Sequence, residues 1–222
     1  MTNFIPIFPL SIVVYPDEQL NLHIFEPRYK QLIAECFEAR RPFGIPTVIN
    51  NQMQEFGTLV HITELSKIYE GGEMDIKTRG EKIFRILEVV QDIPDKLYSG
   101  AIVNYPQTFE DAKPEVVRRL VAGIRELHRV LKVSKNFKKE DSELRSYDLA
   151  HHVGLSLEEE YRLLNFLDER QRLEFLKQHV AKVVPLLAEM ESLKEKIKLN
   201  GHFKNLEGFS GPFTGPQKPQ DE

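Results

Sequence analysis

The residues whose types could carry catalysis or metal binding in this chain are seven histidines and one cysteine. His151 and His152 are adjacent on a predicted short helix, where neighbouring side chains point about 100° apart and cannot easily ligate one metal ion. We interpret one histidine of this pair as packed and the other as solvated. Cys36 shares the apolar face of another predicted helix, which favours a buried, unreactive thiol. The sequence therefore predicts neither a metal site nor a catalytic cysteine.

Sequence motifs that bind nucleotides or activate a nucleophile are absent. The chain contains no G-x-x-x-x-G-K-[ST] loop, no H-E-x-x-H, no G-x-S-x-G and no G-x-G-x-x-G. Its nearest approach to a phosphate loop is Gly71-Gly72 followed by Lys82, but Ile83 stands where Ser or Thr is required. We therefore expect a protein that is not an enzyme and has no cofactor. A hydrolase whose catalytic groups meet only in space is kept as a second alternative.

The charge balance argues against a general attraction to nucleic acid or anionic lipid. The chain carries 30 Lys and Arg against 34 Asp and Glu, a net charge of −4. Residues 1–110 have a net charge of −5, and residues 111–222 have a net charge of +1. Four lysines between positions 132 and 139, with only Phe137 as an aromatic neighbour, indicate a solvated loop. Nucleic acid is an unfavoured partner, and RNA binding is kept as the first alternative.

Three features of the sequence predict where in the cell the protein is located. No stretch approaches the ~18 consecutive apolar residues of a membrane span, so no membrane partner is expected. Residues 4–10 lack a preceding basic segment and contain two prolines, which makes a poor secretion signal. One cysteine excludes an intramolecular disulfide framework. These features together predict a cytoplasmic protein.

Two structurally different parts must position these residues, and together they predict an α+β fold. Residues 1–110 are mainly β, with short runs of β-branched and aromatic residues between Gly, Pro and Asn. The predicted strands are Ile5–Leu10, Gln19–Ile24, Phe43–Ile49, Glu55–Tyr69, Glu73–Arg79, Lys82–Gln91 and Tyr98–Tyr105. One inserted helix should begin at Pro27 and end before Pro42. Gly71-Gly72 predicts a type I′ hairpin turn.

Residues 111–200 predict a helical bundle, because apolar residues there recur every three or four positions. The predicted elements are helices over 114–131, 143–153, 156–167 and 168–197 and a loop over 132–141. Ser156 opens its helix with the spacing of a capping box. Pro185 should kink or split the last helix. Residues 201–222, which are rich in Gly and Pro, predict a flexible tail.

Eight short segments are the most distinctive features of the sequence. They are Phe4–Leu10, Val13–Pro16, Leu20–Tyr29, Phe56–Ile62, Thr78–Gly80 with Phe84–Ile86, Asp148–Ala150, Leu164–Asp168 and Arg172-Leu173. In this order they resemble the N-terminal, substrate-binding domain of Lon proteases, over about residues 4–180. Ile83 departs from the family at a position that is often basic. The resemblance implies a PUA-like β-rich domain at residues 1–110, followed by the helical bundle at 111–200.

The resemblance also implies a function. In Lon this domain helps to engage protein substrates, and an AAA+ ATPase and a Ser-Lys peptidase follow it. We expect neither enzymatic part in this chain. The expected protein is a stand-alone, non-catalytic module that binds unfolded or extended polypeptide, as an adaptor or recognition factor for misfolded chains, with a separate protease as a candidate partner.

The predicted peptide-binding residues lie at two turns. Tyr15 belongs to the turn Tyr15-Pro16-Asp17, and Phe25, Glu26, Arg28 and Tyr29 lie at a junction between strand and helix. Loops held by a rigid sheet are the usual place for recognition. We therefore expect the two segments to lie close together on the β domain with exposed aromatic rings. The alternative is that these rings belong to the core.

Overall fold

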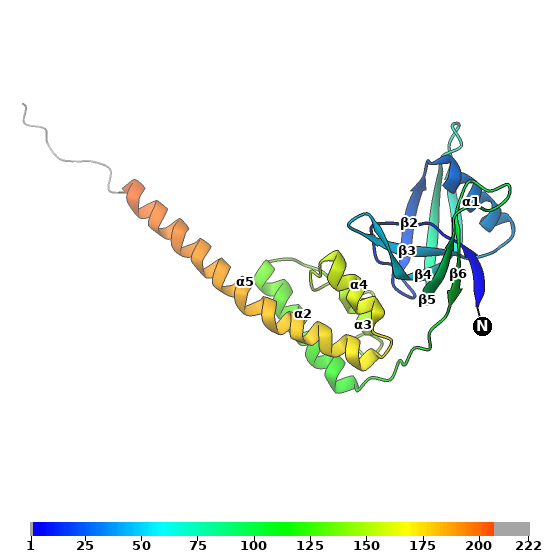
Figure 1. The fold of residues 1–222 in the computed structure, drawn as a ribbon. Coiled ribbons are helices and arrows are strands. Elements are labelled where there is room, and N and C mark those ends of the chain that lie inside the picture. Colours follow the sequence, from blue (N-terminus) through cyan, green and yellow to red (C-terminus); the bar gives the residue numbers. More distant parts are fainter. Residues whose placement is uncertain (1, 207–222) are drawn as a thin grey trace, which may run out of the picture.

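The computed structural model describes residues 2–206. Its elements are β1 (Asn3–Pro6), β2 (Gln19–Ile24), α1 (Pro27–Glu38), β3 (Phe43–Ile49), β4 (Gln52–Ile68), β5 (Met74–Val90), β6 (Gly100–Asn104), α2 (Pro114–Leu131), α3 (Ser146–Ala150), α4 (Leu157–Asn165) and α5 (Glu169–Leu206). They form a β lobe, residues 3–104, and a helical lobe, residues 114–206 (Figure 1). The α+β fold class predicted from the sequence is confirmed.

The β lobe is one antiparallel sheet in the order β1-β6-β5-β4-β3, with β2 paired to the first half of β5. Residues 7–10, which follow β1, hydrogen-bond to the opposite edge strand β3. The Phe8 N–H donates to the Gly44 carbonyl at 2.8 Å, and the Val48 N–H donates to the Leu10 carbonyl at 2.8 Å. These bonds join the two edges of the sheet, which therefore closes around its own core.

Strands β2 and β3 have the predicted bounds, whereas β5 is one strand in place of the two predicted. The pairing of β4 with β5 shifts register at the predicted break, where Leu59 pairs with Lys82 and Val60 with Gly80. Glu81 is therefore an extra residue in β5. Such a bulge bends a strand without ending it. Glu81 beside Gly80 indicates the end of a strand in the sequence, whereas in the structure the strand bends there and continues.

The hairpin between β4 and β5 is also built differently from the prediction. A type I′ turn needs two positive φ angles, but of the glycine pair only Gly72 has one, at +78°. The Gly72 N–H donates to the Tyr69 carbonyl at 2.9 Å, and the Tyr69 N–H donates to the Glu73 carbonyl at 2.9 Å. This pattern is a tight turn that ends in one left-handed glycine, Gly72. The φ angle at position 71 does not require a glycine.

Helix α1 begins at Pro27, as predicted, and covers the sheet with one apolar face. Its buried residues recur at the spacing expected for a helix packed on one side; they are Tyr29, Leu32, Ile33 and Cys36. Burial is the main cause that raises the pKa of the Cys36 thiol to about 12. A thiol that stays protonated at neutral pH and is buried is a poor nucleophile.

The helical lobe follows the predicted order of helices. Helix α4 starts with the predicted capping box, in which the Glu159 N–H donates to Ser156 Oγ and the Ser156 N–H donates to the Glu159 carboxylate. Helix α3 covers five residues and is shorter than the predicted 143–153. The core of this lobe also includes Val13, Tyr15 and Ile83 from the β lobe, so apolar packing continues from one lobe into the other.

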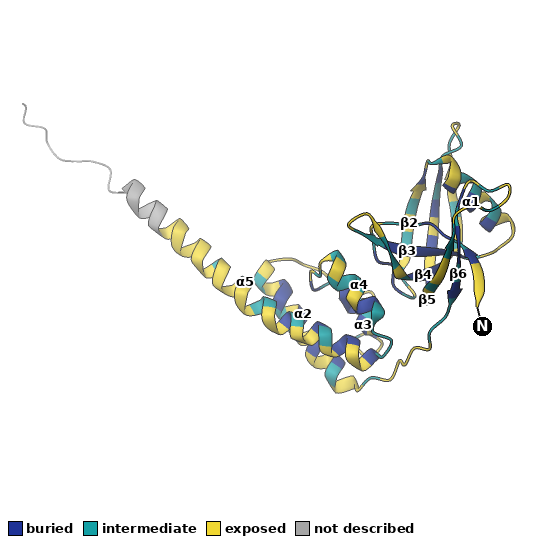
Figure 2. Cartoon of the chain, viewed as in Figure 1, coloured by how far each residue is buried: buried dark blue, intermediate teal, exposed yellow. Residues whose placement is uncertain are grey.

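Helix α5 is continuous through Pro185, so of the two outcomes predicted there, a kink or a split, the split is wrong. Val184 and Leu187, on either side of the proline, pack against the lobe core, while Pro185 itself is exposed. Packing of both flanking turns offsets the one hydrogen bond that a proline removes. Beyond this contact the helix extends away from the lobe, and its side chains over residues 192–199 are exposed (Figure 2).

Residues 201–206 of the predicted tail belong to α5, which extends to Leu206. The rest of that prediction, residues 207–222, lies outside the described residues. Among the helices of the described chain, none combines the length and apolar character that crossing a membrane requires.

Candidate functional site

The structure separates the five residues predicted to bind peptide. Tyr29 is 8% exposed and its ring stacks on Phe8, with ring centroids 4.0 Å apart, so it belongs to the β lobe core. Tyr15 is 1% exposed. Phe25 is 61% exposed and stacks on His23. The expectation of exposed rings therefore fails for both tyrosines and holds for Phe25.

The two predicted segments also lie at opposite ends of β2. Tyr15 precedes this six-residue strand and Phe25 follows it, and a strand of this length spans about 20 Å. Glu26 and Arg28 form an exposed ion pair with each other at 2.7 Å, beside the start of α1. The expected single site on the β lobe is thus not formed, and only Tyr15 lies near the helical lobe.

Tyr15 lies at a groove between the two lobes, with a volume of about 490 Å³. The β lobe contributes residues 15–19 and Arg79 of β5, and the helical lobe contributes residues 135–139 of the loop after α2 and residues 144–152 around α3. A second hollow of about 400 Å³ shares Pro16 and Tyr147 with the first, among other residues, and continues it along the interface. We call these two hollows together the interlobe groove.

Two stacked tyrosines form the floor of the interlobe groove. The rings of Tyr15 and Tyr147 are 4.8 Å apart, and the Tyr15 hydroxyl donates to the Glu160 carbonyl at 3.3 Å. Close approach of the chain at Tyr15 depends on Gly80, because a Cβ there would lie 2.2 Å from the Tyr15 carbonyl oxygen. Gly80, which belongs to one of the segments that resemble the Lon family, is therefore needed for steric reasons where the chain passes Tyr15.

His151 links the lobes at the edge of this floor. Its Nε2 lies 3.0 Å from Glu18 of the β lobe and its Nδ1 lies 3.1 Å from Glu160 of α4. The other oxygen of the Glu18 carboxylate accepts the Tyr15 N–H at 2.9 Å. Hydrogen bonds to Glu160 and then to Glu18 raise the pKa of His151 to about 10, so the ring is charged at neutral pH.

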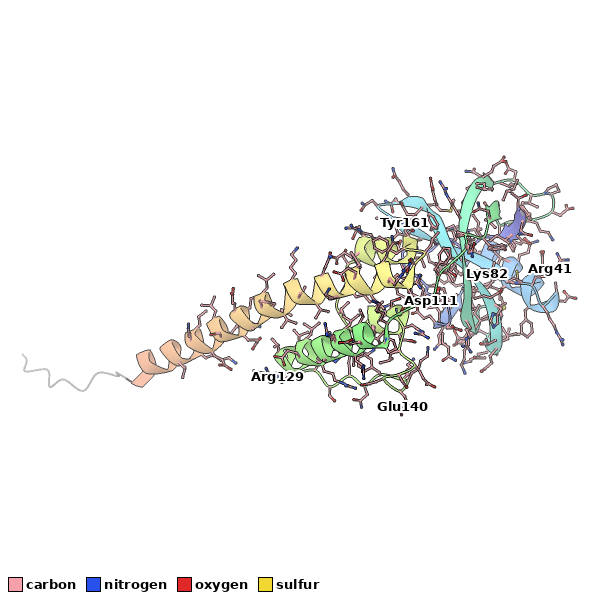
Figure 3. All side chains as sticks on the ribbon, turned by 90° about the horizontal axis from the view of Figure 1, so that it is seen from below. Arg41, Lys82, Asp111, Arg129, Glu140 and Tyr161 are labelled. Atoms are coloured by element: carbon pink, nitrogen blue, oxygen red, sulfur yellow. The ribbon has the colours of Figure 1, made fainter. Side chains whose placement is uncertain are left out.

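A second contact joins the lobes on the side of α4. The Phe56 N–H of β4 donates to the Tyr161 hydroxyl at 3.2 Å. Tyr161 lies on the part of the helical lobe that faces the sheet (Figure 3). Because these two contacts and the shared apolar core come from separate elements, the lobes are held at more than one point.

An ion network around the buried Arg172 ties the segment that connects the lobes to the helical lobe. The Arg172 guanidinium is fully buried and donates to Glu169 (3.0 Å), to Ser146 Oγ (2.9 Å) and to Glu110 of the connecting segment (2.6 Å). It also lies 4.4 Å from the centre of the Tyr147 ring. This network therefore holds the Tyr147 ring of the floor in place, and its Glu110 also lines the second hollow.

Every carboxylate that lines the first hollow is paired with a cation of the groove. Asp17 pairs with Arg79 at 2.9 Å and Asp148 pairs with Lys139 at 2.7 Å. The third carboxylate, Glu18, is paired with His151. Two further lysines line the same hollow, Lys135 and Lys138. Neither forms an ion pair within residues 2–199.

Two polar atoms of the groove lining are buried without a hydrogen-bond partner among the described residues, the Tyr147 hydroxyl and His152 Nδ1. Burial, with the nearby His128 and Lys135, lowers the pKa of His152 and keeps that ring neutral at pH 7. His152 packs against Phe137, while His151 is partly exposed, which is the division predicted for this pair. No group of three metal-binding side chains is found in the part of the chain that the structure describes.

Comparison with known proteins places this fold in a family. The family described as "ATP-dependent protease La (LON) substrate-binding domain" matches residues 5–182. The chain belongs to the Lon substrate-binding domain family. A Lon N-terminal domain protein from Xanthomonas campestris has a similar structure, with a TM-score of 0.60 and 24% identity over 79% of this chain and 98% of that one. The N-terminal domain of a Mycobacterium avium complex Lon protease gives a TM-score of 0.54 and 15% identity over 81% and 98%.

Most of the groove in this Lon substrate-binding domain could not be found from the sequence. Glu18 and His151, which meet across it, are 133 positions apart. The lysines of the loop after α2 were visible as a basic run, but their place opposite Tyr15 depends on how the lobes pack. The available signal was a run of lysines ending at Lys139, followed twelve residues later by a histidine pair.

Proposed function

We propose that this Lon-family chain is a non-catalytic module that binds misfolded or extended polypeptide, as an adaptor or recognition factor. Membership of the substrate-binding domain family supports a substrate-binding role. A separate protease as partner and a cytoplasmic location are parts of the same proposal. The purified chain is expected neither to hydrolyse ATP nor to cleave unfolded casein, and robust turnover that a point substitution abolishes would contradict this expectation.

The interlobe groove is the observation that carries the proposal. The partly exposed Tyr147 ring, backed by the buried Tyr15, supplies apolar area, and Tyr147 and His152 carry buried polar atoms that lack a partner within the described chain. Buried polar groups in proteins are nearly always hydrogen-bonded, so such atoms indicate a partner from outside. An extended polypeptide offers both apolar side chains and backbone donors and acceptors at regular spacing.

Site-specific photo-crosslinking tests this proposal. A photoreactive amino acid at Asn136, an exposed residue of the groove lining, should crosslink to a labelled, permanently unfolded polypeptide. The matched control carries the same group at Asp92, an exposed residue between β5 and β6. Crosslinking at Asn136 and not at Asp92 is the expected result. Equal crosslinking at both positions, or none at either, would refute binding in the groove.

A further inference from the structure

We propose that the interlobe groove selects polypeptide segments that carry carboxylate side chains; this inference rests on the proposed function and specifies the substrate class of the same groove. The observation behind it is the balance of charges in the first hollow. Its three carboxylates are each paired with a groove cation, and Lys135 and Lys138 remain unpaired within residues 2–199. A chain that fills the hollow therefore meets a surplus of positive charge.

His151 adds no free positive charge to this surplus, because two carboxylates share it. It pairs with Glu18 inside the hollow and with Glu160 outside the hollow lining. Its positive charge is distributed between two carboxylates, of which both are less exposed than the lysines. No groove carboxylate is left to pair with Lys135 or Lys138, so their nearest candidate partner is a ligand.

The partnerless polar atoms agree with an anionic ligand group. The Tyr147 hydroxyl is a donor at neutral pH, because burial raises its pKa further above the ordinary value. A neutral His152 ring carries one N–H. Donors and lysine ammonium groups lining one hollow match the acceptor oxygens of a carboxylate, which has no donor of its own.

The rest of the chain strengthens this selection. Residues 1–110 have a net charge of −5 and the whole chain has −4. An acidic segment is therefore repelled by the net charge of residues 1–110 and attracted at the groove. A local potential of opposite sign to the surrounding surface steers encounter to one place and depends strongly on salt.

RNA is the less favoured ligand of the same basic loop. Binding a phosphate backbone requires several clustered cations, and bases are usually held by stacking on exposed aromatic rings. Three cations of the groove form no ion pair within residues 2–199, Lys135, Lys138 and Arg145, which are few for a phosphate backbone. Its floor tyrosine Tyr15 is buried with its ring already stacked on Tyr147. A carboxylate side chain on an extended polypeptide needs neither a run of phosphates nor a free aromatic face.

The test compares two labelled extended peptides of equal length and apolar content, one with Asp and Glu and the other with Asn and Gln at the same positions. Fluorescence anisotropy with the full chain should show about tenfold tighter binding of the acidic peptide in 50 mM salt, since two partly screened charge pairs supply a factor of this size. The preference should disappear in 500 mM salt.

Paired variants locate the preference. The double variant K135Q/K138Q should bind the acidic and amide peptides with equal affinity. The control K182Q/K198Q removes two exposed lysines of α5 that also form no ion pair within residues 2–199, and it should keep the full preference. Both variants change the net charge equally, so a difference between them reports position.

Three outcomes would overturn the inference. Equal binding of both peptides by the unmodified chain would refute carboxylate selection and leave the proposed function standing. Binding of neither peptide, together with no groove crosslink to unfolded polypeptide, would refute the proposed function itself. Displacement of the acidic peptide by a single-stranded RNA at lower concentration than by unlabelled acidic peptide would assign the groove to nucleic acid.

Discussion

The ion pairs of His151 predict a pH-dependent stability that one substitution should remove. His151 joins Glu18 of the β lobe to Glu160 of the helical lobe, and its pKa is raised to about 10. A raised pKa in the folded state means that folding favours the protonated ring. The contribution is complete below the unfolded pKa of about 6.5 and is lost as the pH rises towards 10.

The size of this contribution follows from exposure. If the whole difference between a pKa of about 10 and the ordinary 6.5 acted on stability, it would amount to about 5 kcal/mol. The His151 side chain is 45% exposed, so water screens both pairs. Two such partly exposed, charge-assisted pairs are expected to contribute about 1–2 kcal/mol together.

Urea unfolding at a series of pH values measures this contribution. We expect H151Q to lower the free energy of unfolding by about 1–2 kcal/mol at pH 6, and the difference from the unmodified chain should shrink towards zero at pH 10. The control is H61Q, which replaces an exposed histidine of β4 outside the groove. Lysines, tyrosines and the cysteine titrate equally in all three proteins, so the difference isolates His151.

A pH-independent difference between H151Q and the unmodified chain would refute the reasoning, because it would mean that folding does not change the pKa of the His151 ring. A loss of stability in H61Q as large as in H151Q would show that the effect is not specific to the bridge between the lobes.

Three further substitutions test the placement of individual groups by thermal or urea unfolding. Y29A should cost about 3–5 kcal/mol because Tyr29 is a core residue, while F25S should change stability by less than about 0.5 kcal/mol; equal effects would contradict their burial. Y147F should be neutral or stabilise by up to about 1 kcal/mol, since it removes a buried hydroxyl without a partner in the described chain, and clear destabilisation would reveal a missed bond. R172A should cost about 3–5 kcal/mol by leaving Glu169 buried and uncompensated, and a cost below 1 kcal/mol would refute the network.

Local signals in the sequence located most elements of this fold. Pro27 and Pro114 stand at the first positions of α1 and α2, and the capping box of Ser156 opens α4, as predicted. These signals work because a helix start is decided by groups within one turn of it. The sequence was misleading where distant contacts decide the structure. The split predicted at Pro185 is wrong because the lobe core holds both flanking turns, and the strand end predicted near Glu81 is a bulge defined by the partner strand.

The same distinction explains the predicted site. Tyr15 and Tyr29 occur beside turns, and a turn in the sequence does not tell which side of it faces the core. Tyr29 belongs to the buried face of α1, while Tyr15 is covered by a helical lobe that begins about a hundred residues later. Exposure of an aromatic residue is thus a property of the whole packing, and the sequence alone left it open.

Packing between the lobes also sets the kind of binding this groove can support. The lobes share an apolar core through Val13 and Ile83, a buried network through Arg172 and a bridge through His151. A groove held at several independent points is preformed, so few side chains or loops of the protein become ordered when a ligand binds. The entropy cost of binding then falls on the extended polypeptide, which must lose backbone freedom at every ordered residue. Affinity should accordingly be modest, and a modest affinity lets one module sample many unfolded chains and release those that lack the matching charge.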